Sequence, residues 1–251
     1  MARVAGLWRH PIKSHGREKL QEVTLTKGQT MPWDRHWAVT HHDTKWNADD
    51  PRWIMCRNFM ITVATPGLAG IWAELDEPTR TLTLRHDTIG SHTFCPDDPA
   101  EISGFLNWVM PLCPPDKRQP SGVVAAPGRG MTDTSFPSIS IMNMATHRAF
   151  EGRLGRKLEL ERWRGNIWLD GPAPWEEFEW TGQTVRVGTA ELEVQEPIRR
   201  CMATAANPRT GLRDTDTLSV LREAWAHQQF GVYAVVSKTG KVAVNDNVEV
   251  L

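Results

Sequence analysis

The segment PIRRCMATAANPRTG, residues 197–211, places a single cysteine, Cys201, directly after Arg199 and Arg200 and ahead of a turn that contains proline. A cysteine is most often a small buried hydrophobic residue. Neighbouring cations favour the thiolate, which is the form that attacks electrophiles and binds soft metal ions. This context makes Cys201 a candidate metal ligand or nucleophile. The other three cysteines are expected to be reduced and structural: Cys56, Cys95 and Cys113.

Cationic side chains that could hold an anion occur in three other segments. In RWRGNI, Arg162 and Arg164 alternate to one face and can grip phosphate bidentately, although an exposed strand face would show the same pattern. In HPIKSHGREKL, Lys13 and Ser14 lie on a glycine-containing loop that can cradle an anion. PWDRHW supplies Arg35 beside an aspartate, where a local salt bridge is the simpler explanation.

The composition limits what these residues can do. The chain has 251 residues, is 40% hydrophobic and 24% charged, and carries a formal net charge of −1. These values predict an ordinary globular protein with no bulk electrostatic reason to bind nucleic acid or an acidic membrane. An anion site must therefore be local. The chain shows neither a signal-peptide core nor an apolar run of membrane-spanning length, so a cytoplasmic location is expected.

The first half of the chain contains mostly short strand patterns. Three segments predict strands because they are bounded by turn residues and are β-branched, aromatic or alternating: 35–41, 59–65 and 81–86. A helix is predicted over 99–110, where apolar residues recur at helical spacing. Residues 113–138 are dense in proline and glycine and predict a loop between two halves. We therefore expect one domain over 1–130 and a second over 131–251.

The second half is predicted to be rich in strands with two helices. Asn143 is a candidate N-cap for a helix over 144–154, and Asp216 for a helix that starts directly after it. Strands are expected in four segments, the last two of them as hairpins: 139–142, 157–163, 184–198 and 231–251. The predicted fold class is α+β, and mainly β.

Taken together, these residues resemble the MOSC family, named for the C-terminal region of molybdenum cofactor sulfurases. The most specific part is RCMATAANPRTG, an arginine–cysteine pair followed by a turn of the form N/D-P-x-T-G. PIKS, WDRHW, RWRGNI and the closing KVAVNDNVEVL support it, in the family's order. The resemblance spans essentially the whole chain. It implies a MOSC β-barrel domain with flanking helices, preceded by a smaller β-rich MOSC N-terminal domain.

The resemblance further implies that the chain binds the molybdenum cofactor, Mo-molybdopterin. Cys201 would be the molybdenum ligand and the catalytic residue, and a soft thiolate suits that metal. The phosphate and polar ring edges of the pterin would be held by seven side chains: Lys13, Ser14, Arg35, Ser135, Arg164, Asn166 and Arg200. Such a site explains why anion-binding residues are scattered along a chain of nearly zero net charge.

The implied activity is that of an oxidoreductase that reduces N-hydroxylated or N-oxygenated small molecules. No four-cysteine cluster follows Cys201, so the electrons would come from a separate ferredoxin- or flavin-type donor. The same pocket would serve a carrier that binds molybdopterin or moves sulfur without substrate turnover. A third alternative is a metal-free thiol enzyme with Cys201 as nucleophile and a histidine such as His227 as base.

Two features depart from the family pattern. Asn207-Pro208 stands where Asp-Pro is common, which removes one charge near the turn. DTSFPS stands where the family has a compact Asp-x-Ser-Pro, so Asp133, Thr134 and Ser135 align only loosely.

Overall fold

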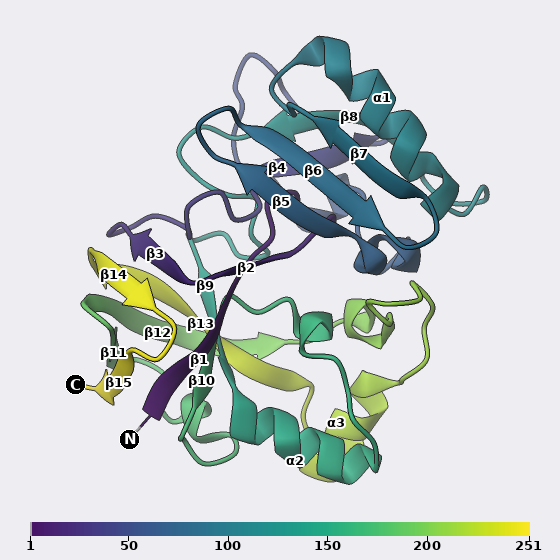
Figure 1. Cartoon of the computed structure of the whole chain (residues 1–251). Coiled ribbons are helices and arrows are strands. Elements are labelled where there is room, and N and C mark those ends of the chain that lie inside the picture. The colour runs from purple at the N-terminus through teal and green to yellow at the C-terminus, as the bar shows by residue number, and fades with distance from the viewer. Residues whose placement is uncertain (1) are drawn as a thin grey trace.

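The strands of the C-terminal half close into a barrel in the computed structural model, which describes residues 2–251 (Figure 1). Seven strands run in the order β10-β9-β13-β12-β11-β15-β1, and β1 pairs back onto β10 to close the ring. Their bounds are β1 Ala2–Arg9, β9 Ile139–Asn143, β10 Ile167–Asp170, β11 Thr184–Val187, β12 Ala190–Arg199, β13 Gln229–Lys238 and β15 Asn247–Val250. Closure satisfies the backbone groups that an open sheet would leave at its edges.

Alternating side chains fill the barrel interior. In the β11–β12 hairpin, Val185, Val187, Leu192 and Val194 are fully buried, while Arg186 and Glu193 face outward. They join one core cluster with the apolar residues of β1, β9, β10 and β13. The short strand β2 (Glu18–Leu20) extends the sheet from β1, and β3 (Glu22–Leu25) pairs with β14 (Gly240–Ala243) as a ribbon.

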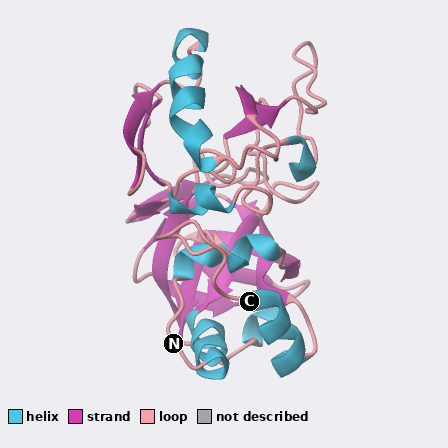
Figure 2. Cartoon of the chain, turned by 90° about the vertical axis from the view of Figure 1, so that its right-hand side faces the viewer, coloured by secondary structure: helices cyan, strands magenta, loops and turns pink. Residues whose placement is uncertain are grey.

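A second, smaller part holds the strands that lie between β3 and β9 in the sequence. Strand β4 (Trp37–His41) pairs with β8 (Pro120–Ala125). Strands β5 (Trp72–Asp76), β6 (Thr81–His86) and β7 (Gly90–Phe94) form a meander beside helix α1 (Pro99–Val109). Phe94 and Phe105 stack at 4.5 Å between ring centroids and join the meander to the helix. Figure 2 shows loops gathered between this part and the barrel.

Two helices cover the lower end of the barrel in Figure 1. Helix α2 (Met144–Leu154) begins at Asn143, whose side chain accepts from the Ala145 amide, and ends at Gly155 in the left-handed conformation. Helix α3 (Thr217–Trp225) begins at Asp216, whose carboxylate accepts from the Ser219 amide. Both N-caps were predicted from the sequence. The predicted α+β, mainly β class is confirmed.

Four local expectations are wrong. Residues 59–65 form turns rather than a strand, and 113–138 contain β8. Residues 157–163 include a 3₁₀-helix, η4 (Leu160–Trp163), in place of a strand. The closing hairpin does not form either, because β14 leaves β13 and pairs with β3 from the start of the chain.

The domain boundary at residue 130 remains a prediction. Strand β1 comes from the first residues of the chain but lies in the barrel between β15 and β10. No helix of residues 2–251 is both long and apolar enough to cross a membrane.

Candidate functional site

A pocket of about 260 Å³ opens between the barrel and the smaller part. Its walls come from loops of both parts and from strands β9, β12 and β13. Six of the residues predicted to bind the cofactor or its metal line it together: Lys13, Ser14, Arg35, Arg164, Arg200 and Cys201. Residues almost 190 positions apart in the sequence therefore meet at one site.

Cys201 lies just beyond the end of β12, where the chain turns into the 3₁₀-helix η6 (Met202–Ala205). Its backbone carbonyl accepts from both the amide and the hydroxyl of Thr204, at 3.2 and 3.0 Å. The thiol is free and exposed. These contacts hold the backbone in place and leave the sulfur accessible at the pocket, as a ligand or nucleophile requires.

Arg200 directs its guanidinium back against the barrel wall. It donates to the Phe230 carbonyl from Nε at 2.9 Å and to the Trp163 carbonyl at 2.9 Å. It also lies over the stacked rings of Trp163 and Phe230. Desolvation lowers the pKa of Arg200 to about 10. Its hydrogen-bond acceptors in the described chain are carbonyls and a sulfur, so its positive charge is not neutralised by an ion pair.

Arg164 is a second cation of the pocket whose charge is not neutralised by an ion pair among the described residues. It donates to the Gly16 carbonyl at 3.3 Å, and no carboxylate among residues 2–251 forms an ion pair with it. Desolvation, and then repulsion from Arg35, lowers its pKa from the usual 12.5 to about 9. A partly buried cation without an ion-pair partner is costly, and a bound anion would relieve that cost.

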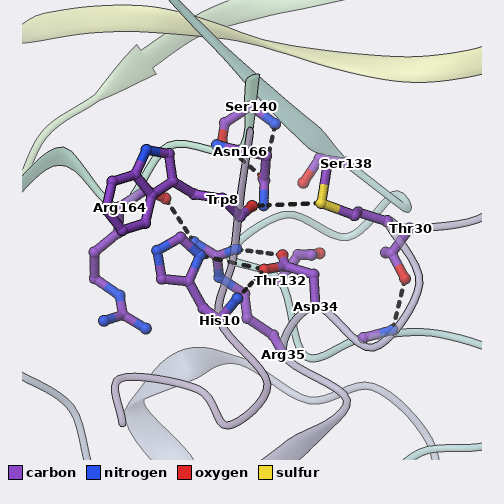
Figure 3. Close-up of polar contacts among 12 residues, drawn as sticks. Trp8, His10, Thr30, Asp34, Arg35, Thr132, Ser138, Ser140, Arg164 and Asn166 are labelled. Atoms are coloured by element: carbon purple, nitrogen blue, oxygen red, sulfur yellow. Dashed lines mark hydrogen bonds and ion pairs between the residues drawn. The ribbon is translucent and has the colours of Figure 1, made fainter. Parts of the chain in front are cut away.

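Arg35 belongs to a buried network beneath the pocket (Figure 3). It forms an ion pair with Asp34 and donates to the Arg164 carbonyl at 3.0 Å. Asp34 also accepts from the His10 amide at 2.8 Å. Burial alone would raise the pKa of Asp34, but Arg35 and His10 hold it well below its usual range. The simple salt bridge considered for Arg35 is thus present, in the wall of the pocket.

Lys13 pairs with the one acid that lines the described pocket. Its Nζ donates to Asp133 Oδ1 at 2.5 Å and to the Met131 carbonyl at 2.7 Å. Burial would raise the pKa of Asp133, but the charges of Lys13 and Arg35 lower it to about 2. Asp133 is therefore an ionised carboxylate at neutral pH, and it orients Lys13.

Three residues of the pocket adopt the left-handed backbone conformation without being glycine. Ser14 has φ of 63°, Arg35 of 53° and Arg164 of 48°. Such conformations are uncommon for side chains with a Cβ and are concentrated at functional sites. The chain thus holds its candidate anion-binding residues in strained positions that the surrounding fold must maintain.

Two of the predicted cofactor-binding residues do not line this pocket. The Asn166 amide accepts from the Ser140 hydroxyl at 2.8 Å and donates to the Trp8 carbonyl at 3.2 Å, so it joins β9 to β1 (Figure 3). Ser135 is exposed, and its carbonyl accepts from Arg129. Direct contacts of either side chain with a cofactor remain predictions.

Other residues that line the pocket were not predicted to bind the cofactor. Tyr233, the one tyrosine of the chain, comes from β13, and burial followed by the charge of Asp133 raises its pKa. Cys56, assigned to the core beforehand, also lines the pocket, and burial raises its pKa. No histidine lines the described pocket, and His227 lies instead against Trp175 and Phe178. An alternating strand pattern marks Tyr233 as half-buried but cannot show which cavity it faces.

Asn207 has a structural role in the turn that follows Cys201. The Asn207 side chain accepts from the Arg209 amide at 2.8 Å and donates to Asp214 Oδ2 at 2.7 Å. An aspartate here would place two carboxylates in contact. Asn207 therefore fits this chain's own turn.

The lowered pKa of Arg164 predicts a pH-dependent stability. A folded-state pKa of about 9 means that, between pH 9 and 12.5, the unfolded chain binds more protons at this residue. Its charge thus destabilises the cofactor-free fold at neutral pH, and the penalty shrinks as the pH rises above 9. We expect Arg164→Gln to stabilise the cofactor-free protein by about 1–3 kcal/mol at pH 7 and by less at pH 10. Urea denaturation of both proteins at pH 7 and pH 10 measures the difference in their free energies of unfolding. Equal or lower stability of the variant at pH 7 would contradict it.

Comparisons with known proteins agree with this geometry. Residues 1–99 match the family profile of the MOSC N-terminal beta barrel domain, and residues 135–249 match that of the MOSC domain. The chain is a MOSC-domain protein. "Mitochondrial amidoxime-reducing component 1" of Mus musculus is 24% identical to this MOSC-domain protein, over 99% of the chain and 82% of the relative.

Two further similarities concern a part of the chain and the fold. A "Molybdenum cofactor sulfurase" of Drosophila grimshawi is 39% identical over 75 residues, which is 30% of this MOSC-domain protein and 10% of the sulfurase. The crystal structure of the YUAD protein from Bacillus subtilis superposes with a TM-score of 0.50 and 14% identity, covering 99% of this chain and 94% of the other. The latter supports the fold alone.

Proposed function

We propose that this MOSC-domain protein binds the molybdenum cofactor and reduces N-hydroxylated or N-oxygenated small molecules with electrons from a separate redox protein. One observation carries the proposal. An exposed thiol, Cys201, opens onto the same pocket as two cations, Arg164 and Arg200, that have no carboxylate partner among the described residues. A soft ligand beside an uncompensated positive cradle fits a group that carries both a metal and a phosphate.

The chain's own residues divide the binding between them. Arg164 and Arg200 would attract the phosphate and the polar ring edges, and Arg35 would keep Arg164 in position through its carbonyl. Lys13, held by Asp133, offers its remaining ammonium proton to the ligand. Cys201 would ligate the metal through a sulfur that the Thr204 contacts hold at the opening. When bound, the cofactor supplies the two-electron chemistry that removes oxygen from nitrogen.

The similarity to an amidoxime-reducing component supports this activity because it extends along almost the whole chain. The overall change, N–OH plus two electrons and two protons to N–H plus water, needs a reductant. The four cysteines lie apart in the sequence and are all free, so this chain shows no cysteine cluster for an iron–sulfur centre of its own. A separate donor is therefore part of the proposal.

The test compares the protein expressed in a host that makes the molybdenum cofactor with the same protein from a host that cannot make molybdopterin. We expect near-stoichiometric molybdenum and pterin in the first preparation. Only that preparation should reduce benzamidoxime with reduced methyl viologen. Absence of molybdenum and pterin from both preparations would refute the proposal.

A carrier function is the second candidate, because a molybdenum cofactor sulfurase shares part of the sequence. A carrier would hold the cofactor in the same pocket but would not turn over substrate. Cofactor-loaded protein that consumes no reduced viologen with benzamidoxime, yet transfers its cofactor to a cofactor-free molybdoenzyme, would favour the carrier.

A further inference from the structure

We propose that the face around the pocket opening docks a small acidic redox protein, which delivers electrons beside Cys201. This inference rests on the proposed function and names the kind of partner that the function requires. It is carried by the charges and apolar side chains on the two sides of the opening.

One side of the opening is formed by the short segment at residues 55–57. Cys56 lines the pocket, and its two neighbours point outward. Met55 is 52% exposed, and Arg57 is exposed. Arg57 uses its carbonyl to accept from Arg118, but its guanidinium makes no hydrogen bond or ion pair to residues 2–251. This side therefore presents one apolar side chain and one free positive charge.

The other side repeats that combination on the turn at residues 207–213. Leu212 is 67% exposed, the highest exposure among the large hydrophobic side chains described. Arg209 and Arg213 are exposed on the same turn. Arg213 donates to the carbonyl of Val63, which lines the pocket, so the turn lies at its edge. Arg199, exposed and also lining the pocket, adds a further charge next to Cys201.

These four arginines contrast with most of the exposed arginines elsewhere. Arg80 pairs with Asp97, Arg85 with Glu74, and Arg148 with Asp170. At the opening, by contrast, no carboxylate of residues 2–251 neutralises the four guanidinium groups. The whole chain has a formal net charge of −1, so the positive charge of this face is local and is not a property of the whole molecule.

A local positive ring around exposed apolar side chains is suited to transient association with an acidic surface. The charges steer and orient the encounter, and the apolar side chains add a small contact area without making the complex long-lived. Low-area contacts are typical of electron-transfer complexes. Since electron tunnelling decays steeply with distance, a donor must approach the exposed sulfur of Cys201, which shares its pocket with Cys56 on one side and Val63 on the other. A small acidic redox protein therefore fits the face.

The probe is reduced plant-type [2Fe–2S] ferredoxin, an acidic protein, and the variants are Arg57→Glu, Arg209→Glu and the double variant. Neither guanidinium makes a hydrogen bond to the described residues, so the fold should tolerate both changes. Lys27→Glu is the matched control, because Lys27 is an exposed turn residue beside the β3–β14 ribbon, where its amide bonds to Thr239. Benzamidoxime reduction by cofactor-loaded protein is measured with ferredoxin and with reduced methyl viologen, and ferredoxin binding is measured by titration calorimetry.

We expect the double variant to raise the KM for ferredoxin at low salt by about tenfold or more, whereas Lys27→Glu leaves it unchanged. Added salt should weaken ferredoxin binding to the wild type and change binding to the double variant much less. Turnover with methyl viologen, a small cation, should not fall in any variant. If viologen turnover is normal but the variants bind and use ferredoxin like the wild type, the docking face is wrong and the proposed function stands. If neither the wild type nor any variant reduces benzamidoxime with methyl viologen, the proposed function fails. The ferredoxin affinities measured by calorimetry then decide the docking proposal alone.

Discussion

Cys201→Ser is expected to lower the molybdenum content of the purified protein at least about tenfold and to abolish amidoxime reduction. A hydroxyl is a harder ligand than a thiolate and is almost entirely protonated at neutral pH, so it cannot replace the sulfur toward molybdenum. Pterin content should fall less than molybdenum content, because Arg164 and Arg200 remain to hold the anionic part of the cofactor. Metal analysis by mass spectrometry and pterin fluorescence after oxidation measure the two quantities separately.

The other cysteines provide the controls for this experiment. Cys95→Ser changes a cysteine outside the pocket and should retain full molybdenum and activity. Cys56→Ser changes the second thiol of the pocket, whose raised pKa keeps it protonated, and should retain most of the metal. Full molybdenum content in Cys201→Ser, or its loss in Cys56→Ser alone, would mean that Cys201 is not the metal ligand.

Features determined by neighbouring residues could be predicted from the sequence. The caps of α2 and α3 depend on Asn143 and Asp216 and on the residues that directly follow them. Helix α1 and the β11–β12 hairpin follow from local periodicity. Six residues that line the pocket were predicted to bind the cofactor or its metal from short motifs, although nothing in their spacing showed that they would meet.

Features determined by distant contacts could not be predicted. Strand β14 pairs with β3 more than 200 residues away in the sequence, so its local hairpin signal was misleading. Residues 157–163 alternate like a strand. Arg162, however, is buried and pairs with Glu159 and Asp214, and the chain around it forms the 3₁₀-helix η4. Asp133 aligned loosely by motif, and its role became visible only through the ion pair with Lys13. Tertiary charge pairing thus overrode local pattern at the site.

Arg162 also gives the largest expected effect on stability. Its side chain is fully buried, and it forms ion pairs with Glu159 at 2.8 Å and Asp214 at 2.7 Å while donating to the Ala205 carbonyl at 3.1 Å. It therefore ties η4 to the segment that follows Cys201. Arg162→Leu would leave two carboxylates and a buried carbonyl without their donor, and we expect it to destabilise the fold by about 3–5 kcal/mol. Thermal denaturation should show a loss of about 6–20 °C in Tm.

The control and the pH dependence separate this effect from a general loss of packing. Arg186→Leu removes an arginine whose side chain is 42% exposed and that also bridges two acids, and should cost no more than about 1 kcal/mol. Burial would raise the pKa values of Glu159 and Asp214, but hydrogen bonds, including those from Arg162, lower both below their usual values. Their contribution is therefore present above the usual carboxyl pKa of about 4 and is lost as the pH falls below it. The stability difference between wild type and Arg162→Leu should narrow on acidification, whereas a loss of packing alone would leave it independent of pH.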